Sequence, residues 1–129
     1  MEEKNEFLIE TDILLEHLTQ KKSTESILDK AMISGTCFTT VINASELFFA
    51  CSNEMERKAV EDLLSALKIL GINSRYSLKI SKFFNKVATT RDAIMCVVAE
   101  INRLPILTYD VNRYNRSGLK IINPLELRG

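Results

Sequence analysis

Short apolar segments alternate with amphipathic segments along this chain, and this alternation is the feature that most limits its possible folds. Apolar, β-branched runs of about 4–8 residues are typical of buried strands, whereas apolar residues spaced three and four apart are typical of helices. Strands that alternate with helices favour a parallel sheet covered on both faces. The pattern therefore predicts an α/β fold, a three-layer α/β/α sandwich with a mostly parallel sheet of four to five strands.

The same patterns place the individual elements. We expect strands at about 7–9, 37–42, 68–72, 106–109 and 119–122. We expect helices at about 13–18, 25–34, 44–51, 53–66, 75–87 and 91–101. The expected N-caps are Ser23 or Thr24, Asn43, Ser74, and Thr89 or Thr90, because hydroxyl and amide side chains accept hydrogen bonds from the free amides of a first turn.

The length and composition are those of a folded protein. A chain of 129 residues has the usual size of one globular domain, so we expect residues 1–129 to form a single domain. With 46% apolar and 26% charged residues, the chain does not have the composition of a disordered segment. The acidic start, MEEKNEFLIETD, fits neither a signal peptide nor a membrane span, so we expect a cytoplasmic protein that does not enter the membrane.

The cysteines and the histidine limit the metals that the chain could bind. Its three cysteines, Cys37, Cys51 and Cys96, are far apart and lie in apolar sequence, so we expect them to be buried and reduced. A structural zinc site lacks its usual ligands, because His17 is the only histidine and no two cysteines are close in sequence. Any bound metal must therefore have oxygen ligands.

Charge is distributed unevenly along the chain. Residues 1–71 hold 7 Lys and Arg against 13 Asp and Glu, whereas residues 72–129 hold 10 against 4. In the basic half, Lys79, Lys82 and Lys86 recur at helical spacing beside the expected buried face of helix 75–87. Such a ridge could bind a polyanion, although an ordinary solvated helix face would have the same pattern.

Four acidic residues lie where the expected strands end or the next helices begin: Glu10, Glu46, Asp92 and Asp110. Functional groups of parallel sheets gather at the carboxyl ends of the strands, so these acids could converge at one edge. Carboxylates that are forced together repel one another unless a cation neutralises them. Mg²⁺ and Mn²⁺ prefer such oxygen ligands, and we expect one of them to bind here.

A simpler interpretation exists for each acid alone. The helix dipole favours acids in a first turn, which could explain Asp12, Glu46 and Asp92. Asp110 could be only a turn residue. The metal interpretation is favoured because all four candidate ligands lie at strand exits of one α/β pattern.

Three segments resemble the PIN-domain family, and in particular the toxin half of VapBC toxin–antitoxin pairs. LIETDILLEHL resembles the opening strand and helix of that family, TTVINASELFFAC the segment around its glutamate, and TRDAIMCVVAEINRLPILTYDVNRY its later acidic segments. The resemblance covers nearly the whole chain. It implies that Glu10, Glu46, Asp92 and Asp110 bind one or two divalent ions, with Thr108 beside the site.

The resemblance also implies a function. We expect a metal-dependent ribonuclease in which Mg²⁺ or Mn²⁺ activates a water molecule that hydrolyses a phosphodiester bond. The RNA backbone would be bound by basic residues: Lys79, Lys82, Lys86, Arg91 and Arg113. The family further implies a homodimer and a cognate antitoxin that buries an apolar segment against the early helices.

One departure from the family favours an alternative. The opening acid is normally aspartate, but here it is Glu10, followed by Thr11 and Asp12. Glutamate extends its carboxylate by about 1.5 Å, and Mg²⁺ tolerates little error in its octahedral shell. Asp12 could supply a further ligand or could cap the helix. The alternative is a catalytically degenerate PIN-like domain that acts as a protein-interaction module.

A phosphoacceptor receiver domain is disfavoured. Such a domain needs an acceptor aspartate at the end of its third strand, and no aspartate lies near Ile72, where the third expected strand ends.

Overall fold

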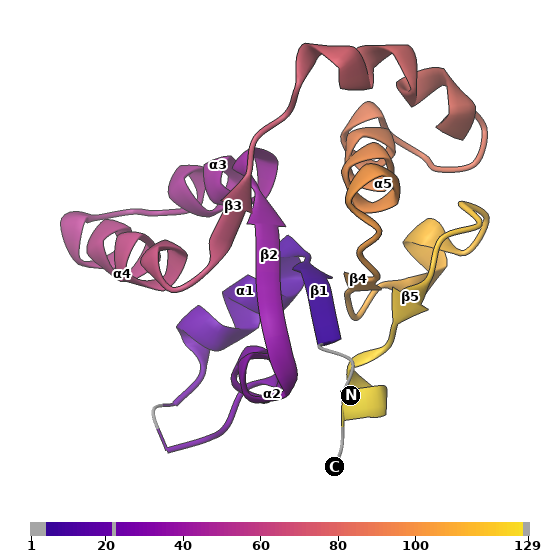
Figure 1. Cartoon of the computed structure of the whole chain (residues 1–129). Coiled ribbons are helices and arrows are strands. Elements are labelled where there is room, and N and C mark those ends of the chain that lie inside the picture. Colours follow the sequence, from indigo (N-terminus) through magenta and orange to yellow (C-terminus); the bar gives the residue numbers. More distant parts are fainter. Residues whose placement is uncertain (1–4, 22, 128–129) are drawn as a thin grey trace.

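The computed structural model describes residues 5–21 and 23–127, so the first four residues of the acidic N-terminal stretch lie outside the described part. At its centre is a five-stranded sheet of order β3-β2-β1-β4-β5, in which every neighbouring pair is parallel (Figure 1). The strands are β1 (Asn5–Ile9), β2 (Gly35–Thr40), β3 (Lys68–Leu70), β4 (Ile106–Leu107) and β5 (Ile121–Ile122). This confirms the expected α/β architecture, with the last two strands shorter than expected.

Helices cover both faces of the sheet (Figure 1). The α-helices are α1 (Thr11–Thr19), α2 (Ile27–Ser34), α3 (Val41–Phe49), α4 (Glu54–Ser65) and α5 (Thr90–Asn102). Four short 3₁₀ helices complete the fold: η1 (Ser74–Leu78), η2 (Ile80–Phe83), η3 (Val111–Tyr114) and η4 (Pro124–Leu127). Within residues 5–21 and 23–127, no helix has the length and apolar character needed to cross a membrane.

The central strand β1 divides the apolar core into two layers. Phe7 and Ile9 pack in one cluster with residues of α1, α2, α3 and α4, whereas Leu8 packs in a second cluster with residues of α5. Alternate side chains of a strand point to opposite faces of the sheet, which explains this division. All three residues are at most 3% exposed, so β1 is fixed from both sides and holds the residue after it in a defined place.

The expected boundary between β2 and the next helix is wrong by about three residues. The β-branched pair Val41 and Ile42, expected in the strand, forms the start of α3, and the N-cap is Thr40 instead of Asn43. The Thr40 side chain accepts hydrogen bonds from the amides of Ile42 and Asn43, and the Asn43 side chain accepts one from the Thr40 amide. This reciprocal capping overrides the strand preference of the two β-branched residues.

The expected helix 75–87 is also wrong. Its residues form η1 and η2, whose turns close through i→i+3 hydrogen bonds, and the N-cap is Asn73 instead of Ser74. Asn85 then adopts a left-handed conformation with φ of 66°, so the chain does not continue as a helix after η2. Phe84 is 77% exposed, whereas its neighbour Phe83 is fully buried.

The N-cap of α2 also differs from the expected one. It is Ser26, and not Ser23 or Thr24, because Ser26 and Asp29 form a complete capping box. The expected N-cap Thr89 is confirmed: its hydroxyl accepts a hydrogen bond from the amide of Asp92. The C-cap of α2 is Gly35.

Gly35 lies where β1 and β2 are too close for a side chain. A Cβ atom there would be 2.1 Å from the backbone oxygen of Asn5, with which Gly35 pairs in the sheet. We therefore expect Gly35→Ala to lower the free energy of unfolding by about 1–3 kcal/mol, the usual cost of overpacking. Urea unfolding would measure it. Gly71→Ala is the matched control, because no atom lies within 4 Å of the added Cβ. Equal midpoints for the two variants would contradict this account of the β1–β2 pairing.

Candidate functional site

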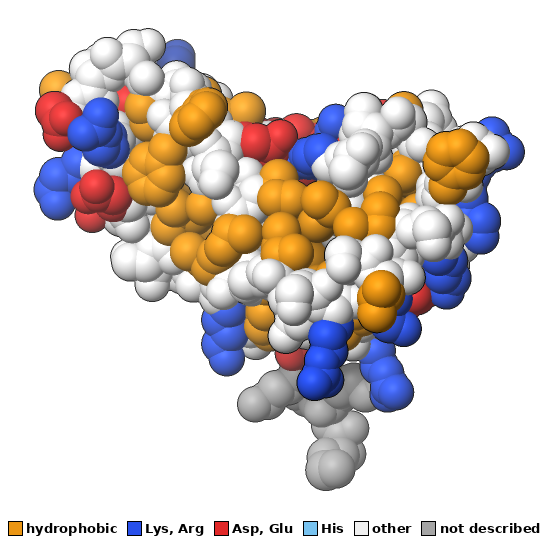
Figure 2. All heavy atoms as spheres, turned by 90° about the horizontal axis from the view of Figure 1, so that it is seen from above, with side chains coloured by type: hydrophobic (Ala, Val, Ile, Leu, Met, Phe, Trp, Pro, Cys, Tyr) orange, Lys and Arg blue, Asp and Glu red, His pale blue; other side chains and the backbone are white. Residues whose placement is uncertain are grey.

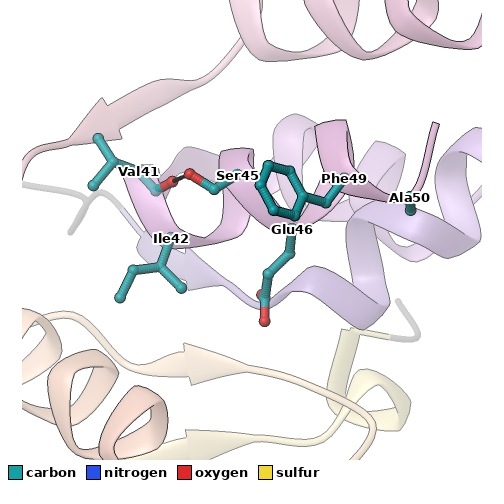
Figure 3. Close-up of a pocket in the computed structure, with 6 residues that line it drawn as sticks. All are labelled: Val41, Ile42, Ser45, Glu46, Phe49 and Ala50. Carbon is teal, nitrogen blue, oxygen red and sulfur yellow. Dashed lines mark hydrogen bonds between the residues drawn. The ribbon is translucent and has the colours of Figure 1, made fainter.

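Three acidic side chains meet at the carboxyl edge of the sheet, where β1 and β2 lead into helices. Glu10 directly follows β1 and is the N-cap of α1, where its carboxylate accepts a hydrogen bond from the Thr11 amide at 3.1 Å. Glu46 extends from α3 (Figure 3), and Asp92 lies in the first turn of α5. Glu10 and Asp92 are each only 1% exposed, and Glu46 is half-buried.

The guanidinium of Arg91 holds these three acids together. Its Nη1 and Nη2 atoms donate to the two carboxylate oxygens of Glu10, each at 2.6 Å. Its Nη2 and Nε atoms also donate to the two oxygens of Glu46, at 2.7 and 3.1 Å. A further bond of 3.2 Å joins Nη1 to Asp92. Paired contacts of this kind are among the strongest hydrogen bonds in proteins, because donor and acceptor are both charged and two bonds form in parallel.

Uncharged groups complete the surroundings of the buried Glu10 carboxylate. The Asn43 amide donates to its Oε1 atom at 3.0 Å, and the Tyr114 hydroxyl donates to its Oε2 atom. The Asn43 amide also donates to the Thr11 hydroxyl at 2.9 Å, and that hydroxyl donates to Glu46 at 2.5 Å. Glu10 is thus fully hydrogen-bonded, as a buried charge requires.

A second arginine binds Asp92. The Nε atom of Arg113 lies 2.9 and 3.0 Å from the two carboxylate oxygens of Asp92. Three negative charges, on Glu10, Glu46 and Asp92, therefore face two positive charges, on Arg91 and Arg113. The cluster keeps one net negative charge.

The pKa values of the cluster follow from this arrangement. Burial alone would raise the pKa of Glu10, but the hydrogen bonds and charge of Arg91, together with the Tyr114 hydroxyl, hold it below its usual range. The pKa of Glu46 is lowered in the same way, against the effect of burial, by Arg91 and by the Thr11 hydroxyl. Burial and the Glu10 charge raise the pKa of Tyr114 far above its usual range, so its hydroxyl stays a donor.

Asp12 takes part in a separate set of hydrogen bonds. Its Oδ2 atom accepts from the Thr108 hydroxyl and from the Tyr109 amide, both at 2.9 Å. Thr108 is 1% exposed and follows β4, so Asp12 ties the start of α1 to the end of the neighbouring strand. Asp12 thus lies at the same sheet edge but bonds to a different segment from Glu10.

Asp110 is the one acid of the expected four that the structure does not bring into the cluster. It is exposed, and its backbone amide donates to the Thr108 hydroxyl at 3.1 Å. Among the residues that the structure describes, its carboxylate has no ion pair and no hydrogen bond. The acids that meet at one point are therefore Glu10, Glu46 and Asp92.

The lysines of the expected basic ridge lie on the segment of η1 and η2, which packs against α5 (Figure 1). Lys79, Lys82 and Lys86 are all exposed. Lys82 forms an ion pair with Glu100 of α5 at 2.5 Å. Basic side chains line one margin of the face seen in Figure 2.

Two residues of the site were not expected from the sequence. Asn43 was expected only as a cap, although its position three residues before Glu46 places both side chains on one side of a helix. Tyr114 was not among the expected site residues, but it is fully buried and its hydroxyl donates to Glu10. No sequence spacing could have placed it, because its position depends on the turn through η3.

The three acids suit a divalent cation in chemical type but not in their present arrangement. Carboxylate oxygens are the ligands that Mg²⁺ and Mn²⁺ prefer. Arg91 already lies between Glu10 and Glu46, and in the described ranges no three His, Cys, Asp or Glu side chains are arranged to hold a metal ion. With Arg91 in this place, the residues do not fit a metal.

Solved structures of toxin–antitoxin complexes share this fold. A toxin–antitoxin complex from Klebsiella pneumoniae aligns with a TM-score of 0.75 and 16% identity, over 92% of this chain and 97% of that one. VapBC2 from Rickettsia felis, bound to a promoter DNA fragment, aligns with a TM-score of 0.77 and 15% identity, over 92% and 98%. DNA-bound VapBC from Salmonella typhimurium aligns with a TM-score of 0.76 and 16% identity, over 93% of this chain and 98% of that one. At these identities the likeness concerns the fold.

The sequence itself carries the family assignment. No curated protein sequence matched the chain. The family model of the PIN domain matches residues 7–117, which include the last three residues of β1, the three clustered acids and Arg91. The chain therefore belongs to the PIN-domain family.

Proposed function

We propose that this protein is the toxin of a VapBC-type toxin–antitoxin pair, a ribonuclease that hydrolyses RNA phosphodiester bonds with Mg²⁺ or Mn²⁺ as cofactor. The observation that carries the proposal is the meeting of Glu10, Glu46 and Asp92 at the carboxyl edge of a PIN-domain sheet. PIN domains are generally nucleases, and the similar solved structures are toxin–antitoxin complexes. We also propose that the protein acts in the cytoplasm.

The proposed ligands of the metal are Glu10, Glu46 and Asp92, with Asp110 and Asp12 as further acids at the same edge. When bound, the ion would activate a water molecule and stabilise the charge that develops on the phosphate. The proposed contacts with RNA are made by Thr108, Arg91, Arg113, Lys79, Lys82 and Lys86. If the guanidinium of Arg91 left the acids, it would be close enough to bind a substrate phosphate, for which its planar donor set is suited.

The proposed protein partners are an antitoxin and a second copy of the chain. Apolar side chains gather on the surface of α3 (Figure 2), where Phe49 is 94% exposed beside a hollow lined by Val41, Ile42 and Ala50 (Figure 3). Exposed phenylalanines are costly in water, which favours a protein that covers them. We propose that the antitoxin lies against the early helices and that an exposed phenylalanine such as Phe84 contacts the second copy.

A second candidate function is a catalytically degenerate PIN-like domain that acts as an interaction module. The observation that favours it is Arg91, which forms ion pairs with all three acids without a metal. The replacement of the usual aspartate by Glu10 also favours it. The two candidates differ in whether the acids ever bind a metal.

RNA cleavage by the intact protein and by Asp92→Asn tests the first candidate. We expect cleavage in Mg²⁺ or Mn²⁺, its loss with a chelator, and at least a ~100-fold lower rate for Asp92→Asn, the usual cost of losing one charged group of an active site. Asp62→Asn, an exposed aspartate of α4, is the matched control and should keep the full rate. Thermal unfolding would establish that both variants are folded.

Equal rates for Asp92→Asn and the intact protein would exclude the proposed site. No cleavage by the intact protein, together with no shift of its unfolding temperature in Mn²⁺, would favour the interaction module.

The salt dependence of RNA binding tests the basic ridge. In the Asp92→Asn background, we expect Lys79→Gln with Lys86→Gln to weaken binding and to reduce the slope of log Kd against log salt by about 1.4, since each phosphate neutralised on a single strand contributes roughly 0.7. Arg57→Gln with Lys58→Gln removes the same charge from α4 and should leave the slope unchanged. Equal slopes for both double variants would show that the ridge does not contact RNA.

A further inference from the structure

The acid cluster already contains a cation of its own. All six carboxylate oxygens of Glu10, Glu46 and Asp92 lie within hydrogen-bond distance of an arginine nitrogen. Arg91 contacts five of the six, and Arg113 contacts the two of Asp92. A metal ion bound by these three acids would therefore compete with a guanidinium for every oxygen that it used.

We propose that the guanidinium of Arg91 and a divalent metal ion are mutually exclusive occupants of the Glu10, Glu46 and Asp92 cluster. This inference rests on the proposed function in so far as it takes the three acids as metal ligands. In the arrangement described here the chain inhibits itself, because Arg91 blocks the place that the cofactor needs. Arg91 is thus a built-in competitor of the metal.

Shared oxygens make the competition direct. The Nη2 atom of Arg91 donates to Glu10 at 2.6 Å and to Glu46 at 2.7 Å. The guanidinium therefore lies between the carboxylates of these two acids. Arg91 also contacts the second oxygen of each acid, so a metal that bound both acids would have to use oxygens that Arg91 already contacts. A divalent ion beside Arg91 would also be repelled, because it would add two positive charges to a cluster that already holds those of Arg91 and Arg113.

The surroundings allow Arg91 to leave. Its side chain is 19% exposed, and that of Glu46 is 39% exposed, so one side of the ion pair opens to solvent. Arg91 lies in the first turn of α5. Glu10 and Asp92, by contrast, are at most 2% exposed and cannot follow. The mobile member of the cluster is therefore the arginine.

Mn²⁺ binding, measured by calorimetry and by electron paramagnetic resonance of the free ion, tests the proposal without any need for catalysis. We expect Arg91→Met to bind Mn²⁺ at least tenfold more tightly than the intact protein, because the competing cation is gone. Arg57→Met, an exposed arginine of α4, is the matched control and should change the affinity less than twofold.

Two further variants keep the test valid if Arg91→Met folds poorly without metal. Arg91→Lys retains a positive charge but cannot form paired hydrogen bonds with two carboxylates at once. Its Mn²⁺ affinity should therefore lie between those of the intact protein and Arg91→Met. Glu10→Gln with Arg91→Met removes both members of the Arg91–Glu10 ion pair and should fold. This double variant should lose the gain in Mn²⁺ affinity that Arg91→Met alone shows.

The outcomes separate this proposal from the proposed function. If the intact protein bound Mn²⁺ as tightly as Arg91→Met, and Asp92→Asn abolished binding, the mutual exclusion of Arg91 and the metal would be contradicted. The proposal that the three acids bind a metal would be retained. If Arg91→Met bound Mn²⁺ tightly but cut no RNA, exclusive occupancy would stand and the ribonuclease proposal would fail. If neither the intact protein, Arg91→Met nor Arg91→Lys bound Mn²⁺, both would be contradicted.

Discussion

The ion pair between Arg91 and Glu10 is the interaction on which the carboxyl edge of this sheet depends. A carboxylate that is 1% exposed is costly to bury unless its charge is paired and its oxygens are hydrogen-bonded. Arg91 supplies the charge, and Asn43 and Tyr114 supply further hydrogen bonds. These partners come from α3, η3 and α5, so the pairing of one buried acid joins segments that are far apart in the sequence. Removing one partner of such a pair typically costs about 3–5 kcal/mol.

The sheet explains why the acids meet. Because β1 and β2 are parallel neighbours, the residues that follow them leave the sheet at the same edge. Glu10 follows β1 directly, and α3 begins directly after β2 and carries Glu46. The first turn of α5 adds Asp92 and, one residue before it, Arg91. The arrangement that gathers the three acids thus also brings an arginine into contact with all of them.

Those parts of the site that depend on the spacing of apolar residues in strands and helices could be predicted from the sequence. Strand and helix patterns predicted the parallel sheet and the convergence of Glu10, Glu46 and Asp92, because both follow from which residues end a strand or begin a helix. The carboxylate of Asp110, which also follows a strand, forms no hydrogen bond or ion pair with the described residues, and periodicity alone does not predict the turn that positions it. Arg91 was expected to face RNA, and adjacency to Asp92 could not reveal that its side chain reaches Glu10, which is 81 residues away in the sequence. Short-range hydrogen bonds overrode propensity at Val41, Ile42 and residues 74–87.

Crystal structures of the protein grown with a chelator and with Mn²⁺, with data collected at the manganese absorption edge, test the central claim most directly. Without metal, the account predicts the Arg91 guanidinium between Glu10 and Glu46. With Mn²⁺, it predicts an anomalous peak bounded by Glu10, Glu46 and Asp92, with Arg91 turned toward solvent. An anomalous peak at these acids with Arg91 still bonded to Glu10 and Glu46, or an Arg91 side chain directed into solvent in the metal-free crystal, would contradict it.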